Sequence, residues 1–420
     1  MSGKTIIEKI FADHSEEEII PGNIVWIDLD VVTARDFGGP NVVKNFQNKY
    51  EGEEVFDPSK VFFTFDLTVP PKTIQYANNQ TICRNFAKEK GLKVFDIDKG
   101  IGTHTLIENG LVTPGSIVVG TDSHMNIFGA INSFGQGMGD VDIAFGFKYG
   151  KTWFEVPETV RVDVKGKSSY EYSAKDLVIK ILSFLKTDKV LGKAVEFYGD
   201  PIEKLDLPGR ITFLSMITEM GGIVGFIPFS SDTVEEIKLM SGLESIPSEI
   251  IADEDAVYSE KINIDISDIE SMVSAPPYPH NGKKISDLER IDIDFGFVGS
   301  CTNGRFEDIL KVWTILKGKK IKEGVKLSIV PATLAVYRKA LETGIFMDLL
   351  DAGAIIANPG CGGCAQGHIG MTGKGDVMVS TGNRNFPGKQ GDGFNYLASP
   401  EIVAYSVLNG FISDREFTND

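Results

Sequence analysis

The segment Gly299-Ser300-Cys301-Thr302-Asn303 directly follows the apolar run 293–298, and Asn358-Pro359-Gly360-Cys361-Gly362-Gly363-Cys364 follows a second apolar run, 354–357. We therefore expect each cysteine segment at the end of a buried strand, where the chain enters a glycine-rich turn. Such turns let the backbone approach a bulky inorganic group and point N–H groups at it. Three thiolates are one short of a closed Cys₄ site, so a metal or cluster held by them would keep one position open for water or substrate.

Other interpretations of the cysteines stay open at this point. The Cys-x-x-Cys spacing at 361–364 also fits a zinc half-site, for which His368 is a candidate fourth ligand. It fits a redox pair as well, although such a pair would not need the distant Cys301. Buried structural cysteines are a further alternative, which the glycine-rich flanks disfavour. Cys83 has no partner motif, and we expect it in the core.

Short β-branched runs alternate with amphipathic helical stretches along the chain, a pattern typical of an α/β fold. The pattern predicts helices at 73–90, ending at Gly91, and at 174–185. It predicts strands at 24–32, 61–65, 116–120, 292–298, 326–330, 354–357 and 376–380. Prolines at 272–284 and 156–158 indicate boundaries, so we expect domains at 1–158, 159–284 and 285–420.

Length and composition exclude several classes of protein. A chain of 420 residues with 42% apolar and 24% charged residues is typical of a soluble protein of several domains. No apolar run approaches the roughly 18 residues of a membrane span, and the N-terminus shows no secretory signal. The net charge of −17 disfavours nucleic acid or an anionic membrane as partner. Four cysteines predict no disulfide framework and fit a reducing, cytoplasmic setting.

A second polar cluster, Gly120-Thr121-Asp122-Ser123-His124, follows the strand expected at 116–120. Active sites of α/β proteins form at the carboxyl ends of parallel strands, and a carboxylate can orient a histidine for proton transfer. A Ser-His-Asp hydrolase is an alternative. However, an adjacent serine and histidine rarely reach the geometry of a nucleophile–base pair, and the sequence has no Gly-x-Ser-x-Gly elbow.

A third cluster, Thr381–Lys389, follows the strand expected at 376–380. Arg384 and Lys389 in a tight polar turn suit carboxylate binding, the arginine as a fork and the lysine as a point charge. The glycine-containing segment 146–152 is one residue short of the P-loop spacing and follows no clear strand, so no nucleotide site is predicted there.

Together, Gly-Ser-Cys-Thr-Asn, Asn-Pro-Gly-Cys-x-x-Cys and Asn-Arg-Asn-Phe at 383–386 resemble the aconitase superfamily, and the similarity runs from Thr5 to Pro400. Within it the chain resembles the large subunits of 3-isopropylmalate dehydratase, homoaconitase and 2,3-dimethylmalate dehydratase. The resemblance implies an α/β fold of three αβα subdomains around a central cleft that holds a 4Fe–4S cluster. It also implies a hydro-lyase or isomerase for a small 2-hydroxy di- or tricarboxylic acid, such as an alkylmalate or homocitrate.

The same resemblance implies roles for individual residues. The cluster would be held by Cys301, Cys361 and Cys364, with a fourth, open iron that binds substrate and acts as a Lewis acid. Glu196 resembles a glutamate that orients a histidine. The other expected catalytic residues are Asp66, His104, Asp122, Ser123 and His124. Arg384, Lys389 and Arg35 are expected at the substrate, and Asn303 and Asn383 around the cluster.

The resemblance also implies a partner. In family members of this length the swivelling domain, with the serine base and a further substrate arginine, is a separate small subunit. The short stretch after Asn385 leaves no segment for it.

Three positions depart from the family pattern. The family's Phe-Asp-His is Phe65-Asp66-Leu67 here, its final arginine is Lys389, and Arg35 stands where members place His or Gln. We interpret these changes as linked, with a cation moved to recognise a different substrate group. The alternative is a paralogue with altered or lost catalysis and a regulatory or binding role. Loss of one general acid, worth typically about 10²–10⁴-fold, need not abolish an elimination that iron assists.

Overall fold

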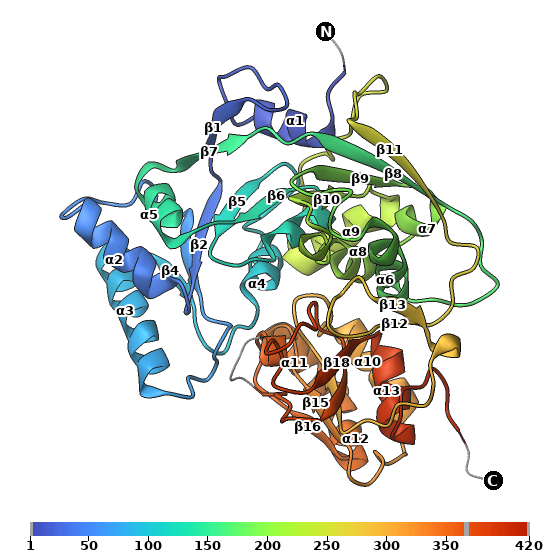
Figure 1. The fold of residues 1–420 in the computed structure, drawn as a ribbon. Coiled ribbons are helices and arrows are strands. Elements are labelled where there is room, and N and C mark those ends of the chain that lie inside the picture. The colour runs from blue at the N-terminus through green and yellow to red at the C-terminus, as the bar shows by residue number, and fades with distance from the viewer. Residues whose placement is uncertain (1–2, 365–368, 418–420) are drawn as a thin grey trace.

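Three main β-sheets follow one another along the chain in the computed structural model, which describes residues 3–364 and 369–417 (Figure 1). The first sheet has five parallel strands in the order β4-β3-β2-β5-β6. Its strands are β2 (Val31–Arg35), β3 (Val61–Thr64), β4 (Lys93–Phe95), β5 (Ile117–Gly120) and β6 (Phe134–Gly137). The helices of this part are α1 (Ile6–Ala12), α2 (Gly39–Lys49), α3 (Ile74–Lys90), α4 (Gly102–Glu108), η1 (Met125–Ile131) and α5 (Asp140–Tyr149).

The strand expected at 24–32 is two strands, β1 (Ile24–Asp28) and β2. β1 alternates exposed and buried residues and pairs antiparallel with β7 (Lys151–Glu155), whereas every residue of β2 is buried in the first sheet. Asp30 lies at the break, where its carboxylate accepts a hydrogen bond from the Ile117 backbone N–H (2.9 Å) and contacts the His14 ring (2.8 Å). The expected helix at 73–90 is confirmed, with the Thr73 side chain capping its start and left-handed Gly91 its end.

The second sheet has four parallel strands in the order β10-β9-β8-β11. They are β8 (Thr159–Lys165), β9 (Ala194–Tyr198), β10 (Val224–Phe226) and β11 (Glu260–Asp265). Its helices are α6 (Ala174–Leu185), α7 (Asp200–Glu203), α8 (Leu207–Leu214), η2 (Thr218–Met220) and α9 (Ser231–Ser241). α6 has the predicted bounds, and one hydrophobic core joins this sheet to one face of the first.

The third sheet has seven strands in the order β13-β12-β18-β17-β14-β15-β16, and β14 to β18 run parallel. The strands are β12 (Met272–Ser274), β13 (Gly282–Lys284), β14 (Phe295–Val298), β15 (Lys326–Ile329), β16 (Ala354–Ile356), β17 (Val377–Ser380) and β18 (Phe394–Leu397). The helices are η3 (Ile285–Asp287), α10 (Phe306–Leu316), α11 (Leu334–Glu342), α12 (Ile345–Ala352), η4 (Gly362–Cys364) and α13 (Pro400–Asn409). The proline-rich segment expected as a linker thus contributes β12 and β13 to this sheet.

Most of the expected site residues lie at the end of β2 or just beyond β3, β5, β14, β16 and β17, at the carboxyl ends of parallel strands, whereas His104 lies on α4 and Glu196 within β9. The first and third sheets meet there. The Cys361 backbone N–H donates to the Asp66 carbonyl (2.9 Å), and the Ile101 N–H to the Ala332 carbonyl (2.8 Å). In Figure 1, α4 lies between these two parts of the molecule. Among the described residues, no helix combines the length and the apolar character that crossing a bilayer requires.

Candidate active site

Cys301 and Cys361 are buried side by side at the carboxyl edge of the third sheet. Cys301 follows β14 and Cys361 follows β16, and the two share a small buried cluster with Ile101 and Ala332. A hydrogen bond with Cys301, together with burial, raises the pKa of the Cys361 thiol well above its usual range. Cys364 is the last residue of η4, and its side chain lies outside the described part of the structure, as does His368.

The turn that follows Cys361 needs glycine. Gly362 has a φ of +57°, and a Cβ there would lie 2.8 Å from a Val330 methyl carbon and 2.9 Å from the Phe297 ring. A side chain would be strained in this conformation and would also fill space against the sheet. Glycine at 362 therefore lets the turn pack tightly against Val330 and Phe297 directly after Cys361.

Arg35 joins three buried groups from different loops. Its Nε donates to Oδ1 of Asp66 at 2.6 Å, and its Nη1 lies 3.0 Å from Oδ1 of Asp122. Its Nη2 donates to Sγ of Cys361 at 2.7 Å. All three nitrogens thus contact protein groups, and two of the five N–H donors of the guanidinium remain, so the expected role of Arg35 at the substrate stays a prediction. In the structure, Arg35 holds two carboxylates and a cysteine together.

The pKa values of the two carboxylates around Arg35 shift in opposite directions. Burial raises the pKa of Asp66 to about 7, although the charge of Arg35 and the Gly102 N–H act against the rise. Burial also acts to raise the pKa of Asp122, but the charges of Arg35 and His124 outweigh it and hold that pKa below its usual value. Oδ2 of Asp122 is buried without a hydrogen-bond partner among the described residues.

His124 lies in a second buried network. Its Nδ1 is 3.3 Å from Oγ of Ser123, and its Nε2 is 3.2 Å from Oε1 of Glu219. The same Glu219 oxygen accepts a hydrogen bond of 2.6 Å from Nε of Arg384, whose Nη1 lies 3.4 Å from Oγ of Ser123. Burial acts to raise the pKa of Glu219, but the His124 and Arg384 charges prevail and lower it. Glu219 therefore orients both the histidine and the arginine.

The expectation that Glu196 orients a histidine is wrong. Its Oε1 accepts a hydrogen bond from the Ile6 backbone (2.8 Å), and its Oε2 accepts from the hydroxyls of Tyr198 (2.6 Å) and Tyr258 (2.7 Å). These partners tie β9 to the start of α1. Sequence reasoning selected Glu196 by resemblance alone, and it missed Glu219, which η2 brings to His124.

His104 is buried on α4, with Nδ1 3.3 Å from Oγ1 of Thr103 and with Nε2 unpartnered among the described residues. Burial and the nearby charge of Arg305 lower the pKa of His104 to about 3. The ring is therefore neutral, and Nε2 has an unused capacity for a hydrogen bond.

The two expected asparagines are buried near the cysteine turn. Asn383 accepts a hydrogen bond from Oγ of Ser300 at 3.1 Å. Asn303 donates to Oδ1 of Asp308 at 2.8 Å, and its own Oδ1 has no partner among the described residues. Lys175, which sequence reasoning also missed, donates to the carbonyls of Thr381 (3.0 Å) and Gly382 (2.8 Å) and so supports the loop that carries Asn383.

Two further positions depart from the family pattern, Leu67 and Lys389, and neither side chain is fully buried. Leu67 is half-buried, and its backbone N–H donates to Oδ1 of Asp36 at 3.1 Å. Lys389 is half-buried, and its backbone N–H donates to the Phe386 carbonyl at 3.1 Å. No described residue forms a hydrogen bond or ion pair with the Lys389 side chain, so its role at the substrate stays a prediction.

Residues 8–410 match the aconitase family (aconitate hydratase). The chain belongs to the aconitase family. It is 38% identical to 3-isopropylmalate dehydratase large subunit 1 of Methanopyrus kandleri, over 98% of this chain and 99% of that protein. It is 39% identical to the 3-isopropylmalate dehydratase large subunit of Nautilia profundicola, over 98% of each chain. Aconitase X of Thermococcus kodakaraensis shares the fold, with a TM-score of 0.51 at 14% identity over 98% of this chain and 92% of that one.

Family membership confirms the predicted aconitase-type α/β fold. The similarity to dehydratase large subunits extends over nearly the whole chain, which indicates a hydro-lyase of this family. The family is typified by a 4Fe–4S cluster, and the described residues fit one. Cys301 and Cys361 supply soft sulfur ligands, and Arg35 offers a counter-charge to thiolates. The described side chains alone contain no group of three or more metal ligands, since the side chain of Cys364 lies outside them.

Proposed function

We propose that this chain is the large subunit of an iron–sulfur hydro-lyase that removes water from, or adds it to, a small 2-hydroxy dicarboxylic acid. An alkylmalate such as 3-isopropylmalate is the preferred substrate, and dimethylmalate and homocitrate are the nearest alternatives. The observation that carries the proposal is that two buried networks lie next to each other. In the first, Arg35 contacts Asp66, Asp122 and Cys361, and in the second, Glu219 contacts His124 and Arg384. The His124 backbone N–H donates to Asp122 and so joins the two networks. The full-length similarity to 3-isopropylmalate dehydratase large subunits supports the choice of substrate.

Three cysteines would hold the cluster: Cys301, Cys361 and Cys364. When bound, a 4Fe–4S cluster with one iron free of cysteine supplies a Lewis acid for the substrate hydroxyl. Arg35 would donate to the sulfur of Cys361, a contact of the kind that tunes a metal ligand. Asn303 and Asn383 would fix the surrounding turns through their hydrogen bonds to Asp308 and Ser300.

The residues around this centre divide the remaining tasks. Arg384 is partly exposed and held by Glu219, so it is placed to bind a substrate carboxylate. His124, oriented by the same glutamate, is placed to move a proton, and Ser123 and Asp122 border it. The neutral ring of His104 offers Nε2 as a hydrogen-bond partner. Leu67 would face an apolar substrate group where the family has a proton donor.

A separate small subunit would complete the site. Relatives are named large subunits, which supports a small-subunit partner. The resemblance to the family implies that the serine base lies on that partner. The purified chain, loaded anaerobically with iron and sulfide, should therefore turn over alkylmalates, citrate or homocitrate only with its cognate small subunit. Full activity of the chain alone would refute the two-subunit assignment. No activity on any acid with both subunits would favour the regulatory paralogue.

A further inference from the structure

A two-stranded ribbon, formed by β1 and β7, lies near α1 and belongs to none of the three main sheets (Figure 1). The inner face of the ribbon is part of the core, since Val25, Ile27 and Thr152 are buried. Its outer face carries the cross-strand pair Trp26 and Trp153, which are 45% and 51% exposed. Exposed tryptophans are typical of contact surfaces, because a partner that covers them buries a large apolar area.

The outer edge of β1 is closed by the chain itself. Hydrogen bonds across an antiparallel pair alternate, so every second residue points its N–H and C=O groups away from the partner strand. In β1 these residues include Trp26 and Asp28. The Trp26 N–H donates to Oε1 of Glu17 (2.8 Å), and the Asp28 N–H donates to the His14 carbonyl (2.9 Å). These donors therefore need no partner molecule.

The outer edge of β7 is open. The Leu29 N–H donates to the Gly150 carbonyl (2.8 Å), so the even-numbered residues of β7 bond to β1. Lys151, Trp153 and Glu155 point their backbone groups the other way, and all three residues are exposed. Within residues 3–364 and 369–417, no hydrogen bond joins these backbone groups to another part of the chain. Such an edge is a template for a further strand.

The charge pattern of this edge is complementary to itself. If two antiparallel copies of β7 pair about Trp153, Lys151 of each copy lies opposite Glu155 of the other, and the two tryptophans meet at the centre. A lysine on an open edge usually opposes pairing, but in this register a carboxylate of the second copy faces it. The partner that fits the edge is therefore a second copy of this chain.

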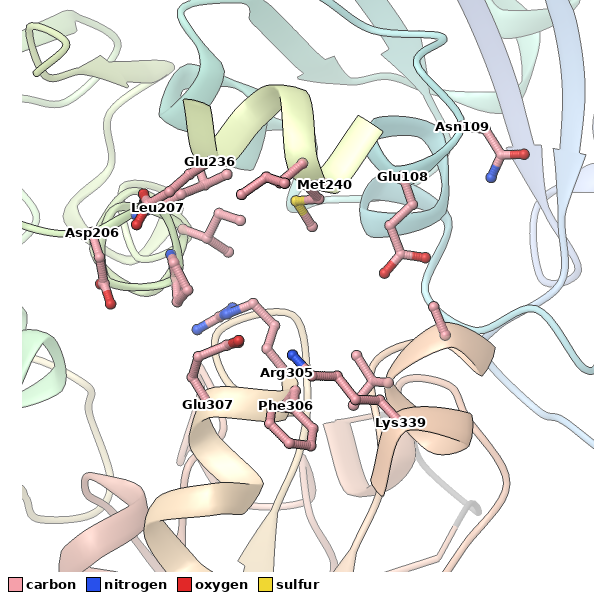
Figure 2. A pocket seen from close by; sticks show the side chains of 15 residues that line it. Glu108, Asn109, Asp206, Leu207, Glu236, Met240, Arg305, Phe306, Glu307 and Lys339 are labelled. Carbon is pink, nitrogen blue, oxygen red and sulfur yellow. Dashed lines mark hydrogen bonds between the residues drawn. The ribbon is translucent and has the colours of Figure 1, made fainter. Parts of the chain in front are cut away.

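We infer that two copies of this chain form a dimer in which β7 pairs with β7 about Trp153, in one continuous sheet of the order β1-β7-β7-β1. Figure 1 shows the ribbon near the top of the molecule and the third sheet at the bottom. A cavity of about 630 Å³, like the candidate site, lies where helices of the first two parts face the third (Figure 2). The dimer leaves that side open to a small subunit and does not depend on the proposed function.

The oligomeric state of the full-length chain tests the inference, with sedimentation velocity from about 1 to 100 µM as the measurement. The parent should reach twice the mass of one chain at the upper concentrations. Lys151→Glu and Glu155→Lys each place like charges opposite one another twice, so each should weaken dimerisation about tenfold or more. Lys167→Glu is the matched control, because Lys167 is exposed outside the ribbon, and it should leave the dimer intact.

Exchange of the two charges gives the sharpest test. The double variant Lys151→Glu with Glu155→Lys restores opposite charges across the pair and should dimerise like the parent. An equimolar mixture of the two single variants should form a mixed dimer, because every facing pair then has opposite charges.

A parent that stays monomeric at about 100 µM, single variants that dimerise as tightly as the parent, or a mixture that stays monomeric would each overturn the inference. Loss of small-subunit binding in Lys151→Glu, beside a monomeric parent, would place the small subunit on this edge instead.

Discussion

Nε of Arg35 donates a hydrogen bond of 2.6 Å to Oδ1 of Asp66, in the loop where leucine replaces the histidine of the family pattern. The sequence interpretation linked Arg35, Leu67 and Lys389 as one change, and this contact gives the part that joins Arg35 to the Asp66–Leu67 loop a physical basis. Where the family has a histidine beside the aspartate, this chain has a guanidinium that reaches the same aspartate from β2. Arg35 also reaches Asp122 and Cys361, so the substitution changes how the centre of the site is held.

Arg35→Gln should destabilise the protein strongly. Asp66 and Asp122 are both buried, and removing the cation between them leaves uncompensated charge, at a cost of about 3–5 kcal/mol. Urea unfolding of the cluster-free chain measures this loss. Arg290→Gln is the control: its partner Asp292 and the arginine itself are exposed, so the loss should stay below about 1 kcal/mol. Similar losses in both variants would show that Arg35 is not the hub of a buried network.

Leu67→His tests whether the departure tunes the substrate. A polar ring placed against an apolar substrate group costs roughly 1–3 kcal/mol. If that cost is felt in the transition state, the specificity constant on the native substrate falls about 5- to 150-fold. Steady-state kinetics of the parent, of Leu67→His and of Leu67→His with Lys389→Arg, each with its small subunit and an intact cluster, decide the question. A double variant that outperforms the parent on every acid would indicate a degraded site instead.

Glu219 and Glu196 form a matched pair for testing which glutamate serves the histidine. Glu219→Gln removes the charge that orients His124 and Arg384, and we expect kcat/KM to fall by about 10²–10⁴-fold. Glu196→Gln changes a carboxylate that accepts from Tyr198, Tyr258 and the Ile6 backbone, so stability should fall while kcat/KM changes little. The reverse pattern, with activity lost in Glu196→Gln alone, would contradict the site as described.

Much of the fold and of the site follows from local sequence. The helix at 174–185 keeps its predicted bounds because a Ser173–Asp176 capping box and an apolar face act together. The strand ends that carry Asp122, Cys301 and Cys361 are likewise visible in apolar runs and glycines. Glu219 could not be found this way, because its partners His124 and Arg384 lie far away in the sequence and no local pattern marks it. Lys175 could not be found from local sequence either, because a lysine in an amphipathic helix is usually solvated. Its burial results from the packing of α6 against the third sheet.

Glu108→Gln should change how stability depends on pH. Burial raises the pKa of Glu108 to about 7 in the folded protein, from 4.5. Between these values the folded state binds more protons than the unfolded state, so this carboxyl favours folding below pH 4.5 and loses that contribution as the pH rises towards 7. The stability of Glu108→Gln relative to the parent should therefore increase across this window, by up to about 1.4 kcal/mol per pH unit. Parallel stability curves from pH 4.5 to 7 would contradict the buried environment of Glu108.

The central claim is a cluster with one iron that no cysteine holds, and Mössbauer spectroscopy of the ⁵⁷Fe-reconstituted chain with its small subunit tests it most directly. Because Cys301, Cys361 and Cys364 are the proposed anchors, the spectrum should contain one iron site that differs from the rest and shifts when 3-isopropylmalate or another substrate acid is added. The same site should be the first lost on oxidation. Four equivalent iron sites, unmoved by any candidate acid, would contradict the account.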